Sequence, residues 1–141
     1  MKIMRRCLLI VYLFLSNSLL FAQLPDDVQH QLKKATSDTA RIRLLLELSD
    51  ASEDISVMTY ANKALDIINK NLPAAEGELK KTYLDYKAFA LNNIGYGYRT
   101  FTADIQKAII YYKEALAIYE QTGKGDGLTD CISNLQNVYI A

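Results

Sequence analysis

The chain contains two closely similar segments, YANKALDI beginning at Tyr60 and YYKEALAI beginning at Tyr111. Tyr60 matches Tyr111 and Ala64 matches Ala115, and the matched residues stand 51 positions apart. Self-similarity at a fixed spacing is the signature of a repeated supersecondary unit, and it restricts the fold more than any single motif does. We therefore expect two copies of one structural unit.

The repeated segment has the pattern of an amphipathic helix. Its small and apolar residues recur at spacings of three and four, which places them on one face. An acidic residue precedes each copy, Glu53 and Asp104, where the helix macrodipole favours negative charge. The expected buried positions are 57, 60, 61, 64, 65 and 68 in the first copy and 108, 111, 112, 115, 116 and 119 in the second.

The composition favours helices throughout. Half of the residues are hydrophobic and 23% are charged, as in ordinary globular proteins. Only 2 prolines and 6 glycines interrupt the 141 residues, and no run of alternating β-branched residues predicts a strand. We expect an all-α protein.

Residues 1–22 have the organisation of an export signal. Lys2, Arg5 and Arg6 precede an apolar run from Cys7 to Ala22. Polar residues at 16–18 break this run, and it is shorter than the roughly 20 apolar residues of a membrane-spanning helix. A cleavable signal peptide is therefore favoured over a membrane anchor, with cleavage after Ala22 and export to the periplasm or another extracytoplasmic space.

Cleavage after residue 22 would leave 13 basic and 16 acidic residues, a net charge of −3. This balance gives no reason to expect nucleic acid as a partner, or membrane binding by the mature chain. Residues 23–37 read as a leader with a short helix, and they contain the single histidine, His30, for which we expect a surface position.

The mature chain lacks the parts of the common catalytic and metal sites. Its single histidine, His30, lies in the expected leader helix, apart from the repeat region that holds Cys131, so no Ser-His-Asp, Cys-His or multi-histidine site is expected. We expect Cys131 to be a small buried residue. The alternatives are that it forms an intermolecular disulfide or is a reactive thiol. The GKGDG stretch at 123–127 follows a helix and lacks the Lys-Ser/Thr ending of a phosphate loop, so it predicts a turn. No catalytic residue, cofactor or metal is expected.

Another amphipathic segment precedes each repeated helix: RIRLLLELSDAS from Arg41 and LDYKAFALNNIGYGY from Leu84. In the second copy, the two helices carry in order a large apolar residue, a second one, glycine and tyrosine, then alanine, an aromatic residue and alanine. This pattern resembles the tetratricopeptide repeat, with one extra residue in the loop at 102–103. The matching residues are Leu91, Ile94, Gly95, Tyr98, Ala108, Tyr112 and Ala115.

The resemblance covers about residues 39–141 and implies antiparallel helix-turn-helix pairs stacked as a short right-handed solenoid. It divides a domain at 38–141 into about two and a half repeats. A long first helix from about Pro73 to Arg99 explains why the spacing exceeds the family's usual length. The first repeat matches less well, with Leu44, Leu45 and Leu48 at the Leu, Gly and Tyr positions. The repeats are expected at about 39–71, 73–122 and 127–141, the last one incomplete.

In arrays of this family, the first helix of each repeat lines a concave surface that can hold a peptide. Asparagine side chains can pair with both the N–H and the C=O groups of an extended ligand. The alternative is that these asparagines are solvated polar residues. Asp130 and Ser133 stand where carboxylate-gripping members carry basic residues, so that binding mode is not expected. The candidate groove residues are Asn92, Asn93, Tyr96, Ser133, Asn134 and Asn137.

Two functions agree with these features. The first is an exported, noncatalytic repeat module that binds a protein or peptide partner. The second follows from a resemblance to the extracytoplasmic input region of membrane-bound sensor histidine kinases of the Bacteroidetes type, whose kinase would lie beyond residue 141. The incomplete third repeat is expected to leave Ile132, Leu135 and Tyr139 uncovered, so we expect either further chain, self-association or a partner on that face.

Overall fold

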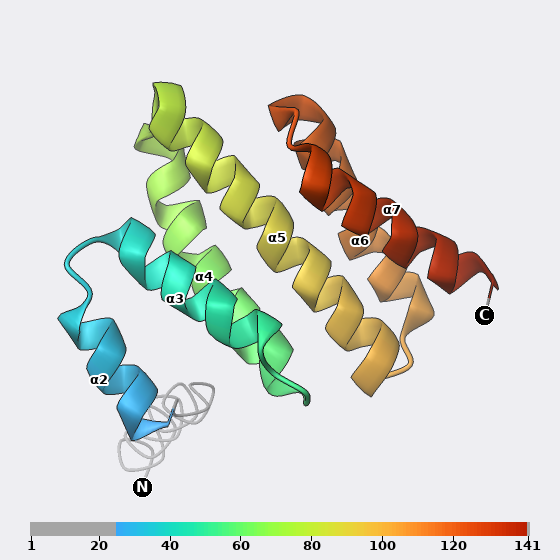
Figure 1. Cartoon of the computed structure of the whole chain (residues 1–141), viewed down its shortest axis with the longest axis horizontal. Helices are drawn as coiled ribbons and strands as arrows, with labels where there is room; N and C mark the ends of the chain where they lie inside the picture. Colours follow the sequence, from blue (N-terminus) through green and yellow to red (C-terminus); the bar gives the residue numbers. More distant parts are fainter. Residues whose placement is uncertain (1–24, 141) are drawn as a thin grey trace, which may run out of the picture. The chain divides into compact units, whose positions relative to one another are not determined.

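The computed structural model describes residues 25–140, so the expected signal peptide at 1–22 lies outside the described residues. All regular structure within 25–140 is helical, as the sequence predicts (Figure 1). The elements are α2 (Asp26–Lys34), α3 (Asp38–Asp50), α4 (Ser56–Asn71), the short 3₁₀ helix η1 (Leu72–Ala74), α5 (Gly77–Phe101), α6 (Ile105–Thr122) and α7 (Gly125–Ile140).

The chain divides into two compact units, one ending at Lys34 and the other beginning at Ala35. The first contains α2, on which Val28 is buried and His30 is exposed. Across residues 25–140, no helix combines the length and the apolar character that crossing a membrane requires.

The second unit has two layers of helices. Helices α3, α5 and α7 lie side by side, and α4 and α6 pack behind them (Figure 1). The longest helix, α5, contacts all four of the others. One side of the unit is therefore formed by α3, α5 and α7, and α5 occupies its middle.

The two repeated helices begin differently. At α6, Asp104 caps the helix as expected, its Oδ1 accepting a hydrogen bond from the Lys107 backbone N–H at 3.1 Å, and this bond lowers the pKa of Asp104. Glu53 has no such role. Asp54 instead accepts from the Ser56 N–H at 2.8 Å, because the turn before α4 places its carboxylate one residue nearer the helix.

The prediction that one helix runs from Pro73 to Arg99 is wrong at its start. Pro73 belongs to the 3₁₀ helix, after which the backbone becomes extended at Ala75, with ψ 140°. Gly77, the first residue of α5, has φ 54°, a left-handed conformation that glycine adopts without strain. This turn separates α5 from the preceding helix, and α5 then continues to Phe101.

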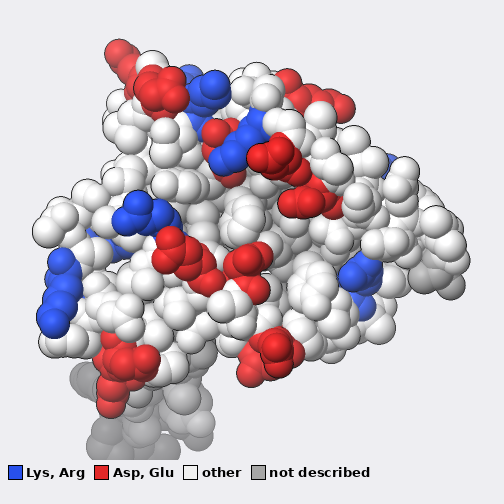
Figure 2. Space-filling view, viewed as in Figure 1, with Lys and Arg blue, Asp and Glu red and all other residues white. Residues whose placement is uncertain are grey.

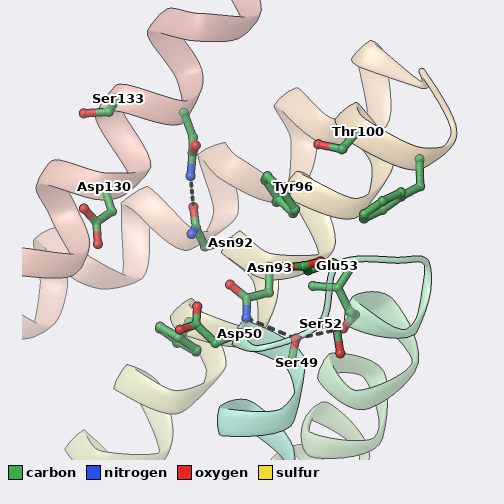
Figure 3. A pocket seen from close by; sticks show the side chains of 14 residues that line it. Ser49, Asp50, Ser52, Glu53, Asn92, Asn93, Tyr96, Thr100, Asp130 and Ser133 are labelled. Atoms are coloured by element: carbon green, nitrogen blue, oxygen red, sulfur yellow. Dashed lines mark hydrogen bonds between the residues drawn. The ribbon is translucent and has the colours of Figure 1, made fainter.

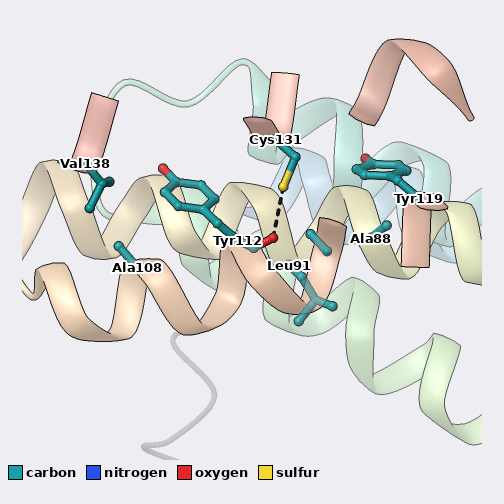
Figure 4. Packing of buried hydrophobic residues seen from close by; sticks show 8 residues of the cluster. Ala88, Leu91, Ala108, Tyr112, Tyr119, Cys131 and Val138 are labelled. Atoms are coloured by element: carbon teal, nitrogen blue, oxygen red, sulfur yellow. Dashed lines mark hydrogen bonds between the residues drawn. The ribbon is translucent and has the colours of Figure 1, made fainter. Parts of the chain in front are cut away.

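The buried faces of the repeated helices are as the periodicity predicts. Each of the twelve expected positions is buried or half-buried. Tyr112 lies fully buried at the centre of the core between α5, α6 and α7 (Figure 4). Its neighbour Tyr111 is half-buried and stacks on Tyr98, with 5.3 Å between ring centroids. On α7, Leu135 packs against this core, so it is not uncovered as expected, whereas Ile132 and Tyr139 are exposed.

Close approach of α5 and α6 depends on Gly95. A Cβ atom at this position would lie 2.8 Å from the ring of Tyr112, inside van der Waals contact. In the first helix pair, α3 and α4, the large and the small residue have changed places. Leu45 on α3 corresponds to Gly95 on α5, Ala61 on α4 corresponds to Tyr112 on α6, and both Leu45 and Ala61 are buried. The large residue is thus on the first helix of one pair and on the second helix of the other.

We expect Gly95→Ala to lower the free energy of unfolding by about 1–3 kcal/mol, because the added methyl group overpacks a ring that has no open space to enter. Urea unfolding followed by circular dichroism measures the change. Gly125→Ala is the matched control, since a Cβ atom there meets nothing within 4 Å. Equal stability of the two variants would contradict the packing argument.

Candidate binding groove

A groove of about 550 Å³ lies on the side formed by α3, α5 and α7 (Figure 3). Its walls come from the end of α3 with the loop after it, from Val57 at the start of α4, from one face of α5, and from α7. Serine, asparagine, aspartate and glutamate side chains predominate, together with three aromatic rings. The lining residues are Ser49, Asp50, Ser52, Glu53, Val57, Phe89, Asn92, Asn93, Tyr96, Thr100, Phe101, Asp130, Ser133 and Asn134.

Most of the groove residues predicted from the sequence lie in this lining. Asn137 does not: it is exposed on α7 outside the groove. Asn137 shares the helical face of Ser133 and Asn134, since steps of three and four residues nearly complete a turn, but it lies one turn farther along α7, beyond the groove lining. The predicted residues that line the groove are Asn92, Asn93, Tyr96, Ser133 and Asn134.

Asn93 has a structural role that the sequence did not indicate. Its Nδ2 donates to Ser49 Oγ at 3.0 Å, and Ser49 Oγ donates to the Val57 carbonyl oxygen at 2.8 Å (Figure 3). Ser49 is fully buried and Asn93 is 6% exposed. This buried network joins α5, α3 and α4, and buried polar groups are costly when they lose their partners. The Asn93 amino group therefore stabilises the floor of the groove.

Asn92 and Asn134 connect α5 to α7. The Asn134 Nδ2 donates to Asn92 Oδ1 at 3.1 Å, and both side chains are half-buried. Within the described residues, the Asn92 amino group and the Asn134 carbonyl oxygen have no hydrogen bond. Each of the two amides thus keeps one group that could pair with the C=O or N–H groups of an extended peptide backbone.

Aromatic rings form part of the wall. Tyr96 meets Phe101 edge to face, with 6.1 Å between centroids. The guanidinium carbon of Arg99 lies 5.6 Å from the centroid of the Tyr96 ring, within the range of a cation–π interaction. Phe89 lies farther along α5 and also lines the groove. The groove therefore offers flat apolar surfaces beside its amide groups.

The charge of the groove is negative. Asp50, Glu53 and Asp130 line it, and its lining contains neither lysine nor arginine. Acidic side chains stand around the hollow in the middle of this face (Figure 2). None of these three carboxylates forms an ion pair with another residue of the range 25–140. They come from three separate segments, and the fold brings them to one hollow.

Sequence reasoning missed Asp50 and Glu53 as groove residues. One signal was present: Asp50 is the last residue of α3, where the helix macrodipole disfavours negative charge. A carboxylate at such a place is locally unfavourable, which indicates a role outside the helix. Glu53 carried no comparable signal, because its position depends on the path of the loop after α3.

A smaller hollow of about 200 Å³ adjoins the groove, and Asp50 and Phe89 line both. Leu46 and Tyr86 add apolar surface to it. Its basic side chains already have acidic neighbours: Lys124 Nζ lies 3.9 Å from Asp85 Oδ2, and Arg43 Nε lies 3.8 Å from Glu47 Oε1. The two hollows together form a continuous surface along α3 and α5.

Cys131 lies outside the groove. It is fully buried, its Sγ donates to the Tyr112 carbonyl oxygen at 3.0 Å, and burial raises the pKa of its thiol to about 11 (Figure 4). These features agree with a packing residue and not with a reactive thiol. In the range 25–140, no three histidine, cysteine, aspartate or glutamate side chains are grouped so as to hold a metal ion.

No family model, curated protein or solved structure matches this chain.

Proposed function

We propose that this chain is an exported, noncatalytic helical-repeat module that binds an extended segment of another protein. The groove on α3, α5 and α7 carries the proposal, in particular the paired amides of Asn92 and Asn134 at 3.1 Å. Amide groups that face an open groove can pair with the backbone of a peptide whatever its side chains. Export is proposed from the basic start and apolar run of residues 1–22.

We further propose that the module is a short tetratricopeptide-like solenoid. Two observations support this. Each helix from α3 to α7 packs on the next, and α5 also contacts α3 and α7. The small residue at Gly95 receives the ring of Tyr112, as expected if the two helices form one repeat. In such an array, α3, α5 and α7 are the first helices of successive repeats and line the binding surface.

The test first selects peptides from a random display library for binding to the immobilised chain from Gln23 onward. Peptides selected on the natural sequence are then measured against Ser133→Trp by fluorescence anisotropy. Ser133 is exposed and lines the groove, so an indole there fills space without disturbing the core. We expect affinity to fall by about tenfold or more, the effect of losing about 1.4 kcal/mol of binding free energy.

Ala117→Trp is the matched control, because Ala117 is exposed on α6 outside the groove lining. Its affinity for the selected peptides should equal that of the natural sequence. Circular dichroism and thermal unfolding show that both variants remain folded. A library that gives no binders, or binders that both tryptophan variants weaken equally, would contradict the proposed function.

A further inference from the structure

We propose that the groove takes a basic extended peptide, with two or three lysine or arginine side chains in the larger hollow and one apolar side chain in the smaller. This inference rests on the proposed function and specifies the partner. It follows from the charges, the aromatic rings and the division of the surface into two hollows.

The carboxylates of the larger hollow are placed to attract cations. Asp50, Glu53 and Asp130 surround the hollow and have no ion pair within residues 25–140. Together they give the hollow a negative potential, which favours a cationic ligand. Complementary charge also increases the association rate and rejects partners of the wrong sign. Acidic peptides are therefore disfavoured here.

A second feature adds to the negative potential independently of these side chains. Helix α3 ends at Asp50, so its C-terminal end lies at the groove. The last carbonyl groups of a helix carry partial negative charge and favour cations nearby. The last turn of α3 contains no basic residue that would neutralise this charge. A peptide cation at this place interacts with both the dipole and the carboxylate.

The aromatic wall gives the same preference. The guanidinium carbon of Arg99 lies 5.6 Å from the centroid of the Tyr96 ring, so Arg99 already takes part of this wall and a peptide cation would use the remaining ring surface. Phe101 meets Tyr96 edge to face and lines the same hollow. Peptide lysine or arginine side chains can place their aliphatic stems on such rings while their charged ends reach the carboxylates.

The smaller hollow differs in character. Leu46, Tyr86 and Phe89 line it with apolar surface, while Lys124 lies 3.9 Å from the carboxylate of Asp85. A further peptide cation here would lie near the positive charge of Lys124, so it would add little binding free energy. An apolar side chain instead removes the exposed surface of the two rings from water. This difference predicts a peptide in which an apolar residue neighbours the basic ones.

The experiment uses the chain from Gln23 onward and a defined probe. The probe is a fluorescein-labelled, end-blocked peptide of eight residues with three arginines, one leucine and glycine spacers. Two comparison peptides replace the arginines by citrulline, which is uncharged, or by glutamate. Fluorescence anisotropy measures Kd at low and at high sodium chloride. We expect the arginine peptide to bind at least about tenfold more tightly than the citrulline or the glutamate peptide. This difference in Kd should become smaller at high sodium chloride, because salt screens the charges.

The variant carries Asp50→Asn, Glu53→Gln and Asp130→Asn together, changes that keep the shape of each side chain. It should lose the preference for the arginine peptide, with affinity reduced about tenfold or more, since each exposed pair contributes up to about 1 kcal/mol. The matched control neutralises three exposed acidic residues that do not line the groove: Asp66→Asn, Glu78→Gln and Glu120→Gln. It has the same net charge as the groove variant and should bind like the natural sequence.

The outcomes separate the two proposals. If the control variant weakens binding as much as the groove variant, net charge alone attracts the peptide and this inference is overturned. It is also overturned if library-selected peptides are acidic or uncharged but still lose affinity in Ser133→Trp, although the proposed function then stands. If no peptide of any charge responds to Ser133→Trp, both proposals fail.

Discussion

Replacing Tyr112 with alanine is expected to lower the free energy of unfolding by about 3–5 kcal/mol, the range measured for large-to-alanine changes at buried aromatic sites. Tyr112 is fully buried in the core between α5, α6 and α7. Gly95 leaves space for its ring because glycine has no side chain. Removing the ring leaves a cavity that these packed helices cannot easily fill. Urea unfolding followed by circular dichroism measures the loss.

Tyr112→Phe separates the ring from its hydroxyl group. The Tyr112 hydroxyl oxygen is buried and has no hydrogen-bond partner within residues 25–140. A buried polar group without a partner costs about 1–3 kcal/mol, so its removal should keep or raise stability. The phenylalanine variant is therefore the control for the alanine variant. A large loss in both would contradict the packing argument, because it would show that the hydroxyl group makes an important interaction.

The free energy of unfolding is expected to fall steeply between about pH 9 and pH 12. Burial raises the pKa of the Cys131 thiol from 9.0 to about 11 and that of Tyr112 from 10.0 to about 12. Burial raises the pKa of Tyr119 as well. The folded state holds these protons while the unfolded chain releases them at the ordinary pKa values, so stability is fully present below pH 9 and is lost as the pH rises. A rise of two in the pKa, as for Cys131 and for Tyr112, corresponds to about 3 kcal/mol of stability.

Urea unfolding at a series of pH values measures this loss, and the phenolate absorbance of the folded protein reports the tyrosine titration. Cys131→Ala removes the thiol and should move the onset of the pH-dependent loss from about pH 9 to about pH 10, the ordinary pKa of tyrosine. Its stability at neutral pH will be lower because of the lost sulfur atom, so the slope with pH is compared and not the absolute value. A slope equal to that of the natural sequence would contradict a buried, protonated thiol.

The buried faces of the repeated helices were predictable because their small and apolar residues recur at helical spacing. Ala64 and Ala115 recur at one helical phase, and the structure buries both completely. Gly95 stood out in the sequence only as a match to the repeat pattern, and the structure places the ring of Tyr112 against it. The all-α class and the burial of Cys131 also follow from local chemistry, whereas the turn expected at 123–127 is shorter, because residues 125–127 are the first turn of α7. In each case the signal lies within one or two helical turns.

The groove was only partly predictable because its charge depends on contacts between distant segments. Asn93 lies on the predicted face of α5, but its hydrogen bond to Ser49 crosses 44 positions of the sequence. The spacing of residues along a helix shows which of them share a face. It does not show which residue of that face is hydrogen-bonded to a neighbouring helix and which faces the groove. Likewise, Asp50 and Asp130 lie far apart in the chain, and the packing of α3, α5 and α7 brings them into one hollow.

The exchanged bulk of the two helix pairs has a consequence for how the chain folds. If α3 were to take the place of α5 against α6, Leu45 would meet the ring of Tyr112, and the two could not occupy the same space. If α5 were to take the place of α3 against α4, Gly95 would face Ala61 and leave a void between the backbones. Both wrong pairings are therefore less stable than the right ones. The two helix pairs thus differ most at the positions where a wrong pairing would be most costly.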